Sequence, residues 1–126
     1  MNTHVLICDD SNMARKQMAR ALPENLNAEV TFAKNGEEAI EIIQQGQHEV
    51  LFLDLTMPVM DGYETLEIIK QRDLPIIVIV VSGDIQPEAR ERVKKLGALD
   101  FIKKPVDKEK IYSVLDEYGL LGGEDD

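Results

Sequence analysis

The sequence predicts an α/β fold, a doubly wound five-stranded parallel sheet with helices on both faces. Short apolar runs alternate five times with helical patterns along the 126 residues, and this alternation is typical of parallel strands joined by right-handed helical crossovers. The runs at 50–53 and 76–81 are continuously apolar, as expected of strands that are buried on both faces. The length and the 44% hydrophobic content suit one domain with one core.

The individual elements follow from the turn and cap signals between these runs. The expected strands are His4–Cys8, Ala28–Ala33, Glu49–Asp54, Ile76–Val81 and Ala98–Lys103. The expected helices begin at Ser11 or Asn12 and stop at Pro23, then cover Glu37–Gln45, Tyr63–Lys70, Pro87–Gly97 and Lys108–Tyr118. We expect residues 1–120 to form the domain, with the glycine-rich and acidic residues 121–126 as a flexible tail or the start of a linker.

The acidic composition narrows the classes of partner. Asp and Glu number 24 against 14 Lys and Arg, which gives a formal net charge of -10. This charge argues against binding of nucleic acid or of an anionic membrane by the domain, and it is compatible with binding a cation. The single cysteine, Cys8, lies in an apolar run, which favours a buried small hydrophobe over a reactive thiol. With no basic leader and no membrane-spanning run in the sequence, we expect a cytoplasmic protein.

Polar side chains follow four of the five expected strands. Asp9 and Asp10 follow the first strand, Asp54 ends the third, Ser82 follows the fourth and Lys104 follows the fifth. Because the carboxyl ends of parallel strands meet at one edge of the sheet, we expect these groups to converge. Three crowded carboxylates repel one another unless a divalent cation neutralises them. An all-oxygen ligand set favours a hard ion, and Mg²⁺ is the expected one.

This arrangement makes Asp54 a candidate nucleophile that forms an acyl phosphate. The Lys104 ammonium and the Ser82 hydroxyl would then contact the new phosphate oxygens. Movement of Ser82 would empty space that Phe101, on the last strand, fills by rotating inward. We therefore expect phosphorylation to change the surface made by the fourth helix, fifth strand and fifth helix.

Each of these residues also has an ordinary structural interpretation. Asp9 and Asp10 can cap the first helix, Ser82 can be a turn residue, and Phe101 can be plain core. Lys104 can be a solvated surface lysine. A group of basic residues on the fourth helix suits a solvated face, or a surface that meets an acidic partner, and comprises Arg90, Arg92, Lys94 and Lys95.

Taken together, these motifs resemble those of response-regulator receiver domains, in particular the single-domain chemotaxis regulators. The matching pieces are Asp9-Asp10, the stretch LDLTMPVMDG around Asp54, Ser82-Gly83 and Lys104-Pro105, in that order over residues 3 to 118. The resemblance implies a flavodoxin-like receiver fold. It also implies that Asp54 accepts a phosphoryl group from a phosphohistidine of a sensor kinase or phosphotransfer protein.

The resemblance further assigns roles to the remaining residues. It implies that Asp10, Asp54 and the backbone carbonyl of Thr56 ligate Mg²⁺ directly, and that Asp9 acts through water. Ser82 and Lys104 become the pair that senses the phosphate. The implied partner of the switching surface is a downstream target or a phosphatase. A receiver of this kind promotes only its own phosphorylation and dephosphorylation and is not otherwise an enzyme.

Three positions depart from the common pattern or tune it. Phe101 stands where a tyrosine is frequent, so a switch there would lack a phenol hydroxyl and would rest on packing alone. Thr56 and Asp84 lie two residues beyond Asp54 and Ser82, where the resemblance implies that they border the path of the water that removes the phosphate. Asp84 would either orient that water or repel it, and Thr56 is small enough to leave access.

Three alternative functions differ from this interpretation. A haloacid-dehalogenase-like phosphatase would need a second aspartate at the position of Thr56. A flavodoxin-like cofactor-binding module would need a glycine- or hydroxyl-rich phosphate cradle after the first strand, where Asp9 and Asp10 would repel phosphate. A degenerate receiver would act only as a protein-binding module, against which the complete acidic set argues.

Overall fold

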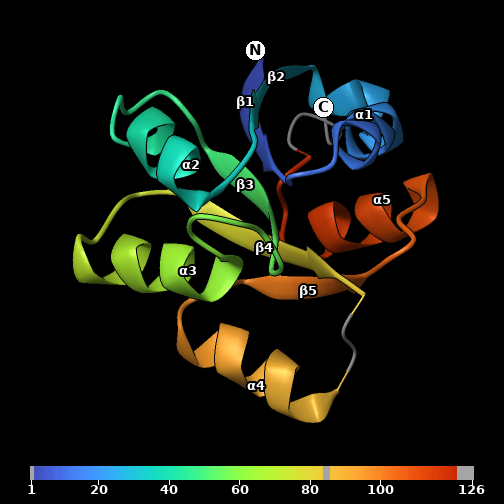
Figure 1. Ribbon diagram of the computed structural model, residues 1–126. Helices are drawn as coiled ribbons and strands as arrows, with labels where there is room; N and C mark the ends of the chain where they lie inside the picture. Colours follow the sequence, from blue (N-terminus) through green and yellow to red (C-terminus); the bar gives the residue numbers. More distant parts are fainter. Residues whose placement is uncertain (1, 84–85, 122–126) are drawn as a thin grey trace.

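The computed structural model describes residues 2–83 and 86–121 and has the predicted doubly wound architecture (Figure 1). All strand pairs are parallel, and the strand order is β2-β1-β3-β4-β5. The strands are β1 (Thr3–Cys8), β2 (Ala28–Ala33), β3 (Val50–Asp54), β4 (Ile77–Ser82) and β5 (Asp100–Lys103). The sequence-based prediction of the fold class is therefore confirmed.

The five predicted helices are also present. They are α1 (Asn12–Ala21), α2 (Gly36–Ile43), α3 (Gly62–Gln71), α4 (Pro87–Lys95) and α5 (Lys108–Glu117). A short 3₁₀ helix, η1 (Glu24–Leu26), was not predicted and joins α1 to β2. The predicted ends lie within two residues of the observed ones, some too long and others too short, which is the usual uncertainty of element boundaries. Ser11 rather than Asn12 caps α1, since its side chain accepts a hydrogen bond from the Ala14 N–H.

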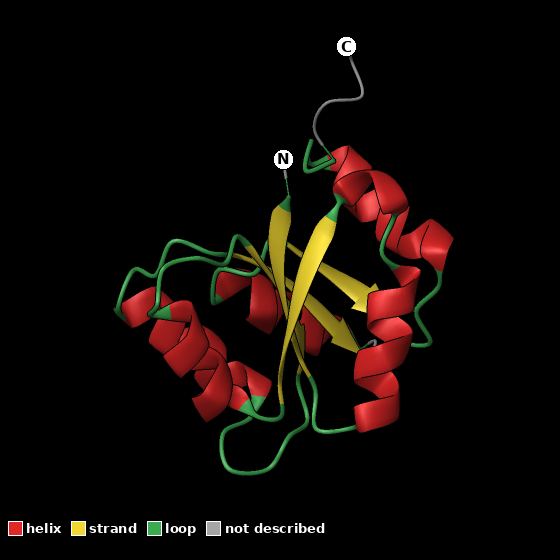
Figure 2. Cartoon of the chain, turned by 90° about the horizontal axis from the view of Figure 1, so that it is seen from above, coloured by secondary structure: helices red, strands yellow, loops and turns green. Residues whose placement is uncertain are grey.

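The sheet separates two apolar cores. Helices α2, α3 and α4 cover one face, where Ile40, Leu66 and Val93 pack against the sheet. Helices α1 and α5 cover the other face, where Met18 and Leu115 pack. The sheet lies between these two helical layers when the chain is viewed from above (Figure 2). The central strand β3 is buried along its whole length, which confirms its prediction as a strand covered on both faces.

The chain order creates a switch point at the centre of the sheet. From β1 the chain passes to β2 on one side, and it then returns to β3 on the other side of β1. The connections that leave β1 and β3 therefore diverge, and the carboxyl ends of these strands border a crevice of the kind that holds ligands in open α/β sheets. The loops after β1 and β3 carry the residues of interest.

Cys8, at the end of β1, is a buried structural residue, as predicted. It is 1% exposed. Burial, with the nearby negative charges of Asp9 and Asp54, raises the pKa of its thiol to about 12. A thiol that stays protonated at neutral pH is a poor nucleophile.

Among the described residues, no helix combines the length and the apolar character needed to cross a bilayer.

Candidate functional site

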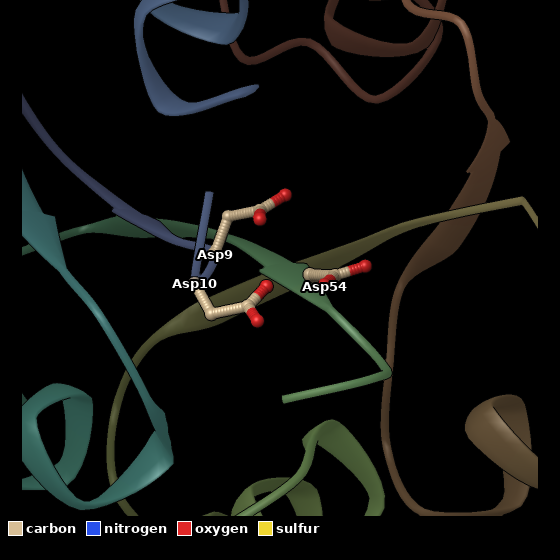
Figure 3. Close-up of side chains that lie close together, drawn as sticks. All are labelled: Asp9, Asp10 and Asp54. Atoms are coloured by element: carbon tan, nitrogen blue, oxygen red, sulfur yellow. The ribbon is translucent and has the colours of Figure 1, made fainter. Parts of the chain in front are cut away.

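Three carboxylates meet where β1 and β3 end. Asp9 and Asp10 directly follow β1, and Asp54 is the last residue of β3; Figure 3 shows the three side chains gathered at this edge of the sheet. One oxygen from each side chain lies within 4.8 Å of the others. Asp9 and Asp54 are buried, whereas Asp10 is exposed. The predicted convergence of these three residues is therefore confirmed.

Lys104 brings a positive charge to this cluster from the turn between β5 and α5. Its Nζ lies 2.9 Å from Asp9 Oδ2 and 3.3 Å from Asp54 Oδ1. Its backbone N–H donates to the Ser82 carbonyl at 2.9 Å, which ties this turn to the end of β4. Lys104 is therefore not the solvated surface lysine of the alternative interpretation.

The charges within the cluster do not balance. Burial raises the pKa of Asp54, and the neighbouring charge of Asp9 raises it further, against the opposing effect of Lys104. Burial acts to lower the pKa of Lys104, but its hydrogen bond to Asp9 and the attraction of Asp54 outweigh that effect, so this pKa is raised. Lys104 stays an ammonium group at neutral pH. One such group faces three carboxylates, and the excess of negative charge favours a bound cation.

The loop between β3 and α3 holds Asp54 in place from the other side. The Gly62 N–H donates to the Leu55 carbonyl at 2.9 Å. Asp61 caps α3 by accepting from the Glu64 N–H, and the Glu64 side chain accepts from the Asp61 N–H in return. This reciprocal capping box fixes the helix start. Thr56 is exposed in this loop.

Comparison with known proteins identifies the family. Residues 5–116 match the profile of the family described as response regulator receiver domain. The chain is a response-regulator receiver domain. Among solved structures, it is similar to chemotaxis protein CheY4 of Vibrio cholerae, with a TM-score of 0.83, 25% identity, and coverage of 93% of this chain and 98% of that chain.

The receiver domain is also similar to a second solved structure and to longer curated proteins. A CheX-CheY-BeF3-Mg+2 complex from Borrelia burgdorferi gives a TM-score of 0.84 at 30% identity, over 92% of this chain and 89% of that one. A protein-glutamate methylesterase/protein-glutamine glutaminase of Bacillus licheniformis is 38% identical over 94% of this chain, but over only 35% of its own length. The Bacillus subtilis protein of the same name is 40% identical over 80% of this chain and 29% of its own length. This receiver thus spans about a third of these curated relatives.

The remaining residues predicted for the receiver site are Ser82 on β4, Phe101 on β5, and Asp84. Ser82 is the last residue of β4 and is 4% exposed. Phe101 on β5 is 6% exposed, and the Arg90 guanidinium lies over its ring at 5.4 Å. The ring is thus already inside, and the predicted inward rotation would need a form in which it is exposed. Asp84 lies outside the described residues, as do residues 122–126 of the tail predicted at 121–126. Leu121, the first residue of that predicted tail, is instead buried in the core beneath α1 and α5.

Sequence reasoning missed Arg15 in this receiver. Arg15 of α1 is buried, whereas the apolar Ala14, Ala19 and Leu22 are only half-buried. One guanidinium nitrogen donates to the Asp9 carbonyl at 2.7 Å. The spacing of Arg15 from Met18 and Leu22, three and seven residues on, carried the signal, but its charge argued for solvent.

The residues of the receiver cluster fit a small divalent cation. All three side chains are carboxylates, which suit hard ions such as Mg²⁺. Both oxygens of Asp9 already accept hydrogen bonds, from the Ser11 N–H to Oδ1 and from Lys104 to Oδ2. Asp10 and Asp54 are therefore better placed to ligate directly, and Asp9 to act through water.

Proposed function

We propose that this receiver accepts a phosphoryl group on Asp54 from a phosphohistidine of a sensor histidine kinase or phosphotransfer protein. An Asp54 oxygen forms the new O–P bond as the P–N bond to the histidine breaks, and the imidazole leaves with the bonding electron pair and is protonated. The observation that carries this proposal is the position of Asp54, buried at the end of β3 beside two carboxylates and the Lys104 ammonium, 3.3 Å from its Oδ1.

Asp10, Asp54 and the Thr56 carbonyl would hold Mg²⁺ in this proposal, with Asp9 acting through water. When bound, Mg²⁺ supplies positive charge to the phosphoryl oxygens. Lys104 supplies a second positive charge from the turn that follows β5, and the Ser82 hydroxyl donates to a phosphate oxygen. In the proposal, Thr56 and Asp84 set how easily water reaches the acyl phosphate.

The output surface in the proposal is formed by α4, β5 and α5. Support comes from how the residues between the site and this surface are arranged. Ser82 pairs with Lys103 in the β4–β5 register, and Val80 pairs with Phe101. Phe101 in turn lies beneath Arg90 of α4. A shift of Ser82 toward phosphate would repack Phe101 and move Arg90, so a target or phosphatase that reads this surface would sense phosphorylation.

The relatives support a place in chemotaxis. In one relative a receiver forms a complex with CheX, and in others the matched part belongs to a longer methylesterase and glutaminase. We infer that this receiver controls either a separate partner or an output domain joined to it. The domain itself is cytoplasmic in this proposal and binds neither nucleic acid nor membrane directly.

The test is intact-mass spectrometry after incubation with acetyl phosphate and Mg²⁺. We expect the wild type to gain one phosphoryl group, and Asp54→Asn to gain none. Asp61→Asn is the matched control, because Asp61 caps α3 in the same loop and should leave the modification intact. The same reaction in EDTA should give no adduct.

A different outcome favours the remaining alternative. If the wild type gains no phosphoryl group from acetyl phosphate or from a phosphohistidine donor, and beryllofluoride does not bind either, Asp54 is not a phosphoacceptor. The degenerate receiver that only binds partners would then replace this proposal.

A further inference from the structure

Arg15 is a buried cation that the proposed chemistry does not use. It lies on α1 and is only 9% exposed. Its guanidinium donates to the Asp9 carbonyl at 2.7 Å and to Asn12 Oδ1 at 3.3 Å, and it lies 5.9 Å from the centroid of the Phe32 ring. Its Nε is buried without a hydrogen-bond partner. Within the described part of the chain, no carboxylate forms an ion pair with it.

Such a burial is unfavourable unless something offsets it. Removing a guanidinium from water without a paired carboxylate carries a large desolvation cost. The two neutral acceptors and the Phe32 ring return only part of that cost. An apolar side chain such as methionine would fill the same place on α1 without this cost, so the charge calls for an explanation beyond packing.

The atom that Arg15 contacts suggests the explanation. The Asp9 carbonyl belongs to the peptide group that joins Asp9 to Asp10, so a hydrogen bond to it restrains the backbone between two residues of the acidic cluster. On the other side of the same turn, the Ser11 N–H donates to Asp9 Oδ1 at 2.9 Å. The turn is thus held at its carbonyl by Arg15 and at its carboxylate by Ser11.

We propose that Arg15 is a positioning residue for the cation site: its guanidinium holds the Asp9 peptide group so that the carboxylates of Asp9 and Asp10 stay directed at the cation. This inference rests on the proposed function, since it concerns the same Mg²⁺ site. Groups that orient metal ligands without touching the metal commonly change its affinity by about 10- to 100-fold when they are replaced.

The sign of the effect separates positioning from simple electrostatics. Arg15 is positively charged, so its charge alone opposes a bound cation, and removing that charge should strengthen Mg²⁺ binding. Loss of positioning should weaken Mg²⁺ binding. A purely structural role would lower the stability of the fold and leave the affinity of the folded protein for Mg²⁺ unchanged or slightly higher.

The experiment is calorimetric titration of Mg²⁺ into the metal-free protein, under conditions where circular dichroism shows each variant folded. Arg15→Met should raise the dissociation constant about 10-fold. Lys16→Met is the matched control, because it removes the same charge from an exposed neighbour on α1, and it should leave the constant unchanged or lower it. Urea unfolding in EDTA reports the separate effect on stability.

Arg15→Lys provides a second test that does not depend on the folding of Arg15→Met. It keeps the charge but loses the fork that reaches both the Asp9 carbonyl and Asn12, so any change in affinity reflects geometry. We expect weaker Mg²⁺ binding than in the wild type and stronger binding than in Arg15→Met. Asn12→Ala removes one partner of the fork and should weaken binding by a smaller factor.

Two outcomes overturn the inference in distinguishable ways. If the wild type binds Mg²⁺ and both Arg15 variants bind it as tightly or more tightly, Arg15 has only a structural role and the proposed function stands. If the wild type binds no Mg²⁺, the proposed metal site is wrong, and the inference fails with it.

Discussion

Asp54 shows, at the scale of one residue, that a functional group can lower the stability of the folded protein. Its carboxylate is buried next to Asp9, and both effects raise its pKa above the ordinary value. The ionised form is therefore destabilised in the folded protein relative to the unfolded chain. Lys104 contacts both carboxylates but does not cancel the effect. In the proposal, this destabilised carboxylate is the group that attacks phosphorus.

The pH dependence of stability should reveal this cost. In the metal-free protein, unfolded Asp54 loses its proton near pH 4, about its ordinary pKa, while folded Asp54 keeps it to higher pH. The folded state thus binds more protons in that window, and its stability from this group falls as pH rises through the window. Asp54→Asn removes the charge, so at neutral pH in EDTA we expect it to be more stable than the wild type by about 1 kcal/mol.

Urea unfolding of both proteins between about pH 4 and pH 7 measures the difference. Because other carboxylates titrate in both proteins, their difference isolates Asp54. The gap should be smallest at the acid end and widest at neutral pH. A gap that stays constant with pH, or a less stable Asp54→Asn at neutral pH, would contradict the assigned direction of the pKa shift.

At the scale of elements, the β3–α3 loop depends on a glycine at the start of the helix. A Cβ on Gly62 would lie 2.5 Å from the Asp54 carbonyl oxygen and 2.7 Å from Leu55 Cα. Both are backbone atoms of the segment that carries Asp54, so they cannot move without moving the site. The close approach of α3 to the end of β3 therefore requires the absence of a side chain.

Gly62→Ala should accordingly lower both stability and phosphorylation. We expect a loss of about 1–3 kcal/mol in the free energy of unfolding from the clash, together with slower acetyl phosphate labelling of the protein that remains folded. Gly83→Ala is the control, because a Cβ there meets nothing within 4 Å, and its stability should change by less than about 0.5 kcal/mol. Equal stability of Gly62→Ala and the wild type would show that the loop can relax away from α3.

At the scale of the whole molecule, the net charge of -10 opposes the folded state. Like charges held together in a compact chain repel one another, and salt screens this repulsion. The carboxylates of Asp9, Asp10 and Asp54 are the most crowded part of this charge that the described residues show. Two effects of added salt should therefore be separable, general screening and specific binding at the cluster.

We expect KCl to stabilise the wild type modestly and MgCl₂ at matched ionic strength to stabilise it more. A ligand at 100 times its dissociation constant that binds only the folded state adds about 2.7 kcal/mol to the free energy of unfolding. Thermal or urea unfolding in the two salts measures the excess. Asp54→Asn should respond equally to KCl and lose most of the Mg²⁺ excess. If MgCl₂ and KCl act alike on the wild type, the cluster does not bind Mg²⁺.

The sequence by itself determined the fold class and the core of the site. Continuous apolar runs such as 50–53 can be satisfied only by burial on both faces, and the strand–helix alternation then leaves one right-handed parallel topology. Once the strands are parallel, Asp9, Asp54 and Lys104 must lie at one edge. These predictions succeeded because they depend on chain order and hydrophobic pattern alone.

Only the tertiary structure decided which side chains pack around that edge. Arg15 is charged and was therefore expected to face solvent, yet in the fold its guanidinium is buried and donates to the Asp9 carbonyl. Gly62 ends the stretch LDLTMPVMDG, and the need for a glycine there comes from the backbone of Asp54 and Leu55, which approaches it closely in space. Phe101 was expected to move inward, and it is already buried under Arg90. The position of each of these three residues depends on contacts with a segment that is distant in sequence or lies across a turn. A local sequence pattern does not encode such contacts.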